Sequence, residues 1–381
     1  MTLRFYDPSE YGIIVTICRM SGTVVPQVLG RPIFWVFLVG NVCLWYSYRV
    51  EDKVNELDKE GSIMHLNWID TKQVTAMTIF FEVFFTNHSY SRYTRLHELS
   101  NDVFRAANRL LFDVHTHLRR GAPEEFSAVR RYLRASVLIF FTSLQREWSE
   151  DDFEHLEKAG LVSAEEARYL KVKPFNQIHH VLLDWIARKA VVGFEKSESK
   201  KYALDLKNLL QRNVDLSDAQ KIVLDIVRKP MPFQYFHFMH LLVVVTLALL
   251  AYGFAMTPSI FGPIAFSSTL FLIIGMLELA KLLSNPFGRD ETDFDITLWM
   301  DNFFQNQLAW QEAPFADLDG HFVGKEGIEL LDALRSTPLL GNSDPNPTQG
   351  LSRKGRSFSR PSRAIAHGDV HGDYALANAA K

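Results

Sequence analysis

Carboxylate side chains gather in one short stretch that directly follows an apolar segment of the chain. Residues 285–295 read NPFGRDETDFD, with Asp290 and Asp293 near the centre. Asn285, the proline after it and Gly288 stop a helix there, which leaves backbone carbonyl groups free and lets the two aspartates converge. Carboxylate and carbonyl oxygens are ligands that Ca²⁺ prefers, although the spacing of an EF-hand is missing. The alternative is an ordinary acidic first turn of a helix, which the helix dipole favours, and the sequence leaves both interpretations open.

A second pattern combines aromatic, small and polar residues on one side of a predicted helix. Residues 73–95 read QVTAMTIFFEVFFTNHSYSRYTR, apolar at first and basic at the end. At about 100° per residue, six side chains fall within an arc of about 80°, which we call the polar–aromatic stripe: Gln73, Ala76, Phe80, Phe84, Asn87 and Ser91. Glu82 points roughly the opposite way, so the stripe carries no formal charge. The stripe fits either a packed or lipid-facing helix or a helix that lines a narrow passage through a membrane.

Two histidines offer a third kind of chemistry. His237 and His240 are three residues apart and share a helix face, and Glu278 lies on the next apolar segment. Together they could ligate a metal in a membrane-embedded metalloenzyme, although histidines at such places more often bond a neighbouring helix. The sequence contains no Walker A loop, dinucleotide fingerprint, H-E-x-x-H or C-x-x-C motif. An enzyme is therefore the alternative here, and we do not expect one.

The composition fits a protein that is partly embedded in a membrane and partly exposed to water. The chain has 381 residues, 47% of them hydrophobic, and a formal net charge of -3, which argues against nucleic-acid binding. Its two cysteines, Cys18 and Cys43, exclude a disulfide framework. The first residues lack the pattern of a signal or transit peptide, so we expect neither.

Four segments are predicted to cross a membrane as helices. Residues 32–48, 239–256 and 260–277 each lack a formal charge over roughly the length of a span, and 73–95 is the fourth segment. By the positive-inside rule, both termini and the 98–230 region are cytoplasmic, and the two short connections lie outside. The protein is expected to be a multi-pass protein of the plasma membrane or an internal membrane. The basic residues that set this orientation are Arg19, Arg31, Arg92, Arg95, Arg228, Lys229 and Lys281.

The charged region between the second and third segments is predicted to be a helical domain. Residues 135–144 are apolar but too few to span a membrane, so they indicate a core helix. Ser163 with Glu166, and Ser217 with Gln220, have the spacing of capping boxes that open helices.

The end of the chain is rich in Pro, Gly, Ser and Arg and is predicted to be a disordered basic tail. Phosphorylation of its serines would place negative charge among arginines, and an unregulated tail is the alternative. The residues concerned are Ser357, Ser359 and Ser362 with Arg353, Lys354, Arg356, Arg360 and Arg363. The predicted parts of the whole chain are a cytoplasmic N-terminal segment (1–30), the first two spans (31–95), a cytoplasmic helical domain (96–230), spans three and four (231–280), the acidic turn with C-terminal helices (281–335) and the tail (336–381).

Two of these motifs resemble those of a known family. The run SNPFGRDETDFD after a two-span hairpin, and FFTNHSYSRY at residues 84–93, are similar to signatures of the bestrophins, a family of pentameric anion channels. The motifs occur in the family's order, and the resemblance covers roughly Arg19 to Glu312. This sequence departs from the family at Tyr93, where a tryptophan is common, and at Arg289 and Thr292, which interrupt the acidic run.

The resemblance implies an all-α membrane protein with four transmembrane helices, a cytoplasmic helical domain and a homopentamer around a central pore. It implies that Ala76, Phe80 and Phe84 form an apolar neck, which passes chloride or bicarbonate because the edges of aromatic rings are partly positive. Gln73, Asn87 and Ser91 would flank that neck. Family members also bind Ca²⁺, and the corresponding ligands here are the side chains of Asp290 and Asp293 and the carbonyls of Asn285 and Leu282, with an N-terminal carbonyl near Tyr6. An anion channel that is gated without Ca²⁺ remains the nearest alternative.

Overall fold

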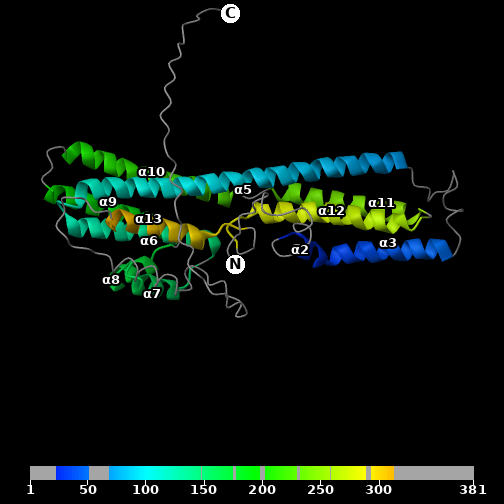
Figure 1. Cartoon of the computed structure of the whole chain (residues 1–381), viewed down its shortest axis with the longest axis horizontal. Coiled ribbons are helices and arrows are strands. Elements are labelled where there is room, and N and C mark those ends of the chain that lie inside the picture. The colour runs from blue at the N-terminus through cyan, green and yellow to red at the C-terminus, as the bar shows by residue number, and fades with distance from the viewer. Residues whose placement is uncertain are drawn as a thin grey trace, which may run out of the picture. The chain divides into compact units, whose positions relative to one another are not determined.

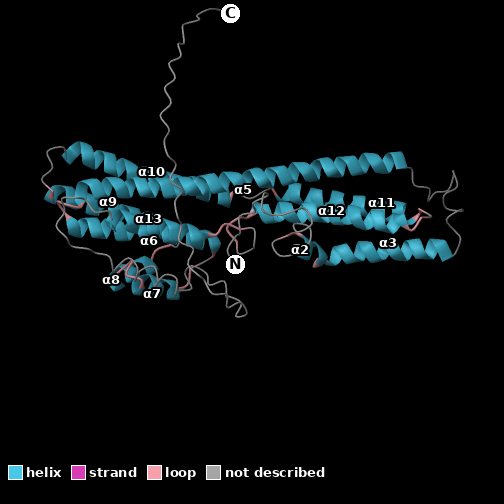
Figure 2. Cartoon of the chain, viewed as in Figure 1, coloured by secondary structure: helices cyan, strands magenta, loops and turns pink. Residues whose placement is uncertain are grey.

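The computed structural model describes residues 23–50 and 68–312, apart from 147, 175–176, 198–201, 230–231, 258 and 289–292. The chain divides into two compact units, Met1–Ser343 and Asp344–Lys381. The secondary structure of the described residues is helical, with no strand among them (Figure 2), so the all-α prediction is confirmed for these ranges. The predictions for Tyr6, Asp290 and the basic tail lie outside the described residues.

The described residues form a series of helices (Figure 1). In chain order they are α2 (Val25–Leu29), α3 (Pro32–Val50), α5 (Trp68–Leu118), α6 (Pro123–Gln145), α7 (Glu150–Lys158), α8 (Ala164–Lys171), α9 (Ile178–Lys196), α10 (Tyr202–Arg228), α11 (Phe233–Ala255), α12 (Phe261–Ser284) and α13 (Ile296–Glu312).

The apolar bundle consists of α2, α3, α11, α12 and the first half of α5, which pack side by side (Figure 1). Phe34 of α3, Leu247 of α11 and Phe266 of α12 are buried in its core. Asn41 is buried between helices and donates its amide hydrogen to the Ala251 carbonyl at 2.7 Å. The outer faces of this bundle expose many large apolar side chains, a surface that suits lipid and that a water-exposed bundle avoids. Examples are Val36, Val39, Leu241, Val245, Ile264 and Leu272.

Among the described helices, α11 and α12 are long and apolar enough to cross a membrane by length and composition. The helix α3 and the first half of α5 do not reach the same hydropathy, because α3 carries tryptophans, tyrosines and one asparagine and α5 carries the polar residues of its stripe. The membrane character of the bundle therefore rests on two helices, and the total of four spans stays a prediction.

The helix α5 belongs to both halves of the described structure. It runs without interruption for 51 residues, about 77 Å at 1.5 Å per residue. Its first half packs against α11 and α12 and its second half against α6 and α10 (Figure 1). The predicted boundary between residues 95 and 96 falls inside this continuous helix.

The charged bundle consists of the second half of α5 with α6, α9, α10 and α13, and α7 pairs with α8 beside it. Leu110 of α5, Leu182 of α9 and Phe304 of α13 are buried in its core. The helix α6 is surrounded by other helices, and every residue from 132 to 142 is buried. The predicted core helix at residues 135–144 is thus confirmed as part of α6.

Of the two capping boxes predicted from the sequence, one is present and one is not, and a further box that was not predicted opens α7. Ser163 caps α8: its hydroxyl accepts from the Glu166 N–H at 3.3 Å, and its own N–H donates to the Glu166 carboxylate at 2.7 Å. Ser217 lies in the middle of α10, so its box with Gln220 is wrong. Ser149 opens α7 with a box that the sequence analysis missed, because the third helical position holds an aspartate.

Glu166 also ties α8 to α6. Arg131 donates from Nη1 and Nη2 to its carboxylate at 2.6 and 2.8 Å, and the Tyr132 hydroxyl donates at 2.5 Å. Burial raises the pKa of Glu166, but these hydrogen bonds and the one from the Ser163 N–H outweigh burial and lower the pKa to about 2. A carboxylate with a depressed pKa stabilises the folded state above its ordinary pKa of 4.5, and this stabilisation is lost as the pH falls toward about 2.

We expect Glu166→Gln to lower the free energy of unfolding of the charged bundle by about 1–3 kcal/mol at neutral pH, because the amide keeps the capping box but loses the ion pair. The difference from the wild type should shrink as the pH falls from 4.5 toward about 2. Thermal unfolding followed by tryptophan fluorescence at several pH values measures both effects. Glu165→Gln, at the exposed neighbouring position, is the control. Equal losses in the two variants would contradict the prediction.

Candidate functional site

The polar–aromatic stripe lies on the side of α5 that no other part of the described chain covers. Phe80 is 67% exposed and Phe84 is 56% exposed, which is unusual for phenylalanine in a folded helix. The other members, Gln73, Ala76, Asn87 and Ser91, are exposed as well. The six residues thus share one exposed side of the helix, as their spacing predicts, and the role of this side in a pore stays a prediction.

The opposite side of α5 is packed and fixes the rotation of the helix about its axis. Phe85 is 2% exposed and contacts the rings of Tyr235 and Phe236 on α11. Thr78 shares a hydrogen bond of 2.6 Å with Thr246 of α11. Glu82 is also buried on this side, as expected from its position opposite the stripe. These contacts hold the stripe outward.

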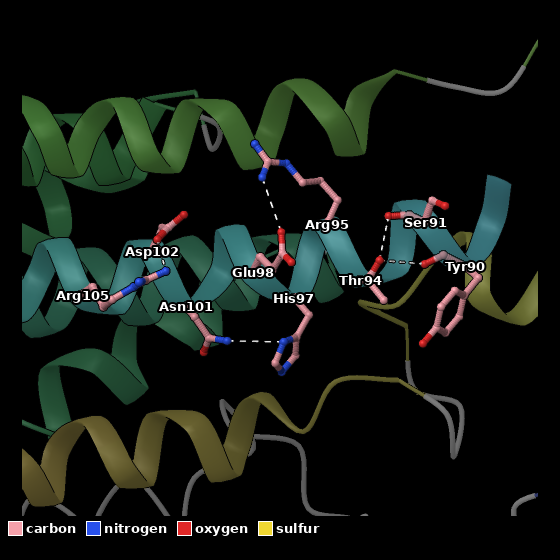
Figure 3. A network of polar contacts seen from close by, with 9 residues as sticks. All are labelled: Tyr90, Ser91, Thr94, Arg95, His97, Glu98, Asn101, Asp102 and Arg105. Carbon is pink, nitrogen blue, oxygen red and sulfur yellow. Dashed lines mark hydrogen bonds and ion pairs between the residues drawn. The ribbon is translucent and has the colours of Figure 1, made fainter. Parts of the chain in front are cut away.

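Beyond the stripe, the same side of α5 carries charged residues, whose contacts are drawn in Figure 3. Arg95 and Glu98 form an ion pair at 3.4 Å, and Asp102 pairs with Arg105 one turn further along. Thr94 donates its hydroxyl hydrogen to the carbonyls of the preceding turn. Because each of these positive side chains is paired with a negative one, neither sign of charge dominates this part of the surface.

The acidic turn, which we define as residues 285–293, connects α12 to α13 and is closed by a backbone hydrogen bond of 2.9 Å from the Phe294 N–H to the Pro286 carbonyl. Asp293 is buried next to Gly288, where a Cβ atom would lie 2.6 Å from Asp293 Oδ2 and 3.9 Å from the Asn285 carbonyl oxygen. Any side chain at position 288 would therefore displace the Asp293 carboxylate.

The predicted calcium ligands are placed as follows. Asp293 and the Asn285 carbonyl both lie beside Gly288, Leu282 is in the last turn of α12, and Asp290 is outside the described residues. Carbonyls of a last helical turn lack intrahelical partners, so a carbonyl there suits a cation. Asp295 has a different role, because its Oδ1 accepts from the Leu298 N–H at 2.9 Å and caps α13. The alternative of an ordinary helix start is thus correct for Asp295.

Aromatic side chains attach the acidic turn to α5. The ring of Phe294 lies 4.8 Å from that of Tyr93 and 5.5 Å from that of His97, measured between centroids. Phe287 is buried and contacts Phe294 edge-on. Tyr93 follows the last residue of the stripe by half a helical turn, so the acidic turn packs on the opposite side of α5, at the level where the exposed side becomes charged.

The alternative of a metal site at His237, His240 and Glu278, which was not expected, is not supported by the structure. His240 uses its Nδ1 for the Phe236 carbonyl at 2.8 Å, and the described residues contain no cluster of three side chains that could hold a metal ion. The Glu278 carboxylate accepts from Arg31 at 2.7 Å and from Lys281 at 3.0 Å, so two cations already neutralise it. This ion cluster was not predicted from the sequence, although a lone acid in an apolar segment signals the need for a partner.

We expect Glu278→Gln to lower the stability of the apolar bundle by about 1–3 kcal/mol, because Arg31 and Lys281 would be left close together without the shared carboxylate. The melting temperature of the purified protein in mild detergent measures the effect. Glu98→Gln removes an exposed pairing with Arg95 and should change stability by less than about 1 kcal/mol. A melting temperature as high as that of the wild type for Glu278→Gln would show that the cluster contributes nothing.

Comparisons with known proteins give a matching family and similar folds. A family model described as "Bacterial/Fungal Bestrophin protein" matches residues 8–307. A mutant bacterial bestrophin homologue from Klebsiella pneumoniae has a similar structure, with a TM-score of 0.63 and 15% identity over 76% of this chain and 99% of that chain. A second structure of a homologue from that organism gives a TM-score of 0.60 and 16% identity over 80% and 98% of the two chains. No curated protein sequence matches this chain significantly.

Proposed function

The chain belongs to the bestrophin family, a family of membrane channels and not of enzymes, and we propose that it conducts chloride or bicarbonate through a homopentameric pore. One observation carries the proposal: the polar–aromatic stripe is exposed while the opposite side of the same helix is packed. A stripe with amide and hydroxyl groups at its ends is poorly suited to lipid, and in a membrane it requires water or protein as a neighbour.

A ring of five copies would give the stripe such neighbours. Each α5 would turn Ala76, Phe80 and Phe84 toward the axis as the neck, with Gln73, Asn87 and Ser91 above and below it. The exposed side chains of Met77, Ile79 and Val83 beside the stripe are apolar and would pack against the next copy. The mass of the protein in mild detergent tests the assembly, and a monomer or dimer would count against it.

The charged and aromatic groups near the stripe either attract anions or do not repel them. The stripe has no formal charge, its aromatic edges are partly positive, and the buried Glu82 faces away from it. Further along α5, the pairs Arg95–Glu98 and Asp102–Arg105 balance each other, and the exposed Arg109 adds one positive charge. A ring of unpaired carboxylates, which would select cations, is missing from this side of the described helix.

Reversal potentials of the purified protein in planar bilayers test the conducted ion. Under gradients of chloride and of bicarbonate, the reversal potential should move toward the equilibrium potential of the anion. Cation-selective currents would overturn the choice of ion, and the absence of unitary currents would overturn the channel itself.

Calcium regulation is the finer part of the proposal. The residues fit the ion, because Asp293 and the Asn285 carbonyl lie together beside Gly288 and the Leu282 carbonyl belongs to the adjoining helix end. With Asp290 they would form a set of oxygen ligands of the kind that Ca²⁺ prefers. Bound Ca²⁺ would neutralise the carboxylates of the acidic turn. Because Phe294 attaches this turn to Tyr93 and His97, a change in the turn would reach α5 below the neck.

A further inference from the structure

A buried arginine joins α6 to α13 in the charged bundle. Arg134 is 5% exposed and Gln307 is 1% exposed. Arg134 donates from Nε to Gln307 Oε1 at 2.6 Å, and its guanidinium also lies over the ring of Phe304. Since α13 contacts α6 over only part of its length, this polar pair is a main feature of their contact.

Both partners keep a buried donor group that has no acceptor among the described residues. Arg134 Nη2 and Gln307 Nε2 make no hydrogen bond within the part of the chain that the structure describes. In Arg134, Nη2 is joined through one carbon to the donor Nε, and in Gln307, Nε2 is joined through one carbon to the acceptor Oε1. Both unsatisfied donors therefore lie beside the same hydrogen bond. A guanidinium edge usually binds the two oxygens of a carboxylate, whereas an amide offers one oxygen and one donor. The amide oxygen therefore serves only Arg134 Nε, and one further acceptor is needed to bind both Arg134 Nη2 and Gln307 Nε2.

The charge of Arg134 is also uncompensated among the described residues. None of their carboxylates forms an ion pair with it, and the neighbouring charge that lowers its pKa is the positive one of Arg130. Burial, and secondly Arg130, lower the pKa of Arg134 to about 9, so the side chain stays protonated at neutral pH. A buried cation without a counter-charge is strongly destabilising. A water molecule could accept hydrogen bonds from the two donors, but it would leave the positive charge of Arg134 without a counter-charge.

We propose that Arg134 and Gln307 form a binding site for one small monovalent anion of the chloride class. The anion accepts hydrogen bonds from Nη2 and Nε2 and neutralises the single positive charge of Arg134. A divalent anion would leave an excess negative charge in this buried place. It lies between α6 and α13, away from the polar–aromatic stripe, and does not depend on conduction. The same α13 begins at the Asp295 cap directly after the acidic turn, so the bound anion stabilises the docking of the segment that carries the turn.

Thermal unfolding of the full-length protein tests the site. At constant ionic strength, replacing gluconate by chloride or bromide should raise the melting temperature by at least about 2 °C, and the rise should saturate with anion concentration. The Gln307→Glu variant supplies its own carboxylate to Arg134. It should be as stable in gluconate as the wild type is in chloride, and chloride should no longer affect it. Arg130→Gln lowers the local positive charge but keeps the pair, so it should retain the response to chloride.

Two results would overturn the proposal. The first is a wild-type melting temperature that is the same in chloride, bromide and gluconate, which would mean that water or a carboxylate from another part of the chain serves Arg134. The second is an undiminished chloride response in Gln307→Glu, which would place the anion elsewhere. If Gln307→Glu does not fold, Arg134→Met serves the same purpose, because it removes the charge and the need for an anion. Crystals grown in bromide should show an anomalous peak beside Arg134 Nη2, and a map without that peak would overturn the proposal as well.

Discussion

Replacing Phe80 and Phe84 together by alanine is expected to give a pentamer that stays assembled and conducts a larger current or no longer closes. Both side chains are mostly exposed in the single chain, so they contribute little to its core. In a ring, each would form an aromatic collar four residues from the other, and two apolar collars make a narrow passage that holds water poorly. Removing them widens and wets this passage, which opposes closure.

Phe85→Ala is the matched control for this experiment. It makes the same change one residue away, on the packed side of α5 where the ring contacts Tyr235 and Phe236. We expect it to cost about 3–5 kcal/mol of stability and to reduce assembly. Single-channel conductance and mass in detergent separate the two phenotypes. Loss of assembly in the double variant would indicate that the stripe is a packing surface. Unchanged gating in an assembled double variant would place the gate in the charged bundle.

The second large effect is expected when Asp290 and Asp293 are both replaced by alanine. The current should lose its dependence on Ca²⁺, because the acidic turn would lose both of its proposed carboxylate ligands. Expression should persist, since the turn is closed by the Phe294–Pro286 backbone hydrogen bond and held by aromatic contacts. Currents recorded from nanomolar to millimolar free Ca²⁺ measure the effect.

Asp295→Asn provides the control for the acidic turn. Asparagine is also a good helix cap, so α13 should be kept and the dependence on Ca²⁺ should remain. If the wild-type current ignores Ca²⁺ over the whole range, the channel is gated without it and the buried Asp293 has a structural role. Loss of Ca²⁺ dependence in Asp295→Asn would move the ligand set toward the start of α13.

The exposed side of α5 could be predicted from the sequence because helical periodicity depends only on the spacing of residues. Gln73, Phe80 and Asn87 recur every seven residues, and the same rule placed Glu82 on the buried side. The length of α5 could not be predicted in the same way. The change from apolar to charged residues near Arg95 looks like the end of an element, although it reflects only a change of surroundings. A helix continues wherever its backbone permits, and residues 68–118 contain neither glycine nor proline.

Contacts between residues that are far apart in the sequence could not be predicted from local sequence patterns. Arg31 and Glu278 are separated by 247 positions, and Arg134 and Gln307 by 173. Each pair depends on how helices from different parts of the chain are docked, which local spacing does not record. Ser217 illustrates the opposite error, because a local capping pattern occurs inside a helix that tertiary packing keeps intact.

The continuity of α5 has a mechanical consequence. A rod without a flexible joint moves as a whole, and the acidic turn touches it near its midpoint at Tyr93. If that contact acts as a fulcrum, a tilt of about 5° moves Phe80 by about 1.7 Å and the end of the rod at Leu118 by about 3 Å in the opposite direction. In a ring of five such levers, dilation at the level of Phe80 is therefore accompanied by contraction at the level of Leu118.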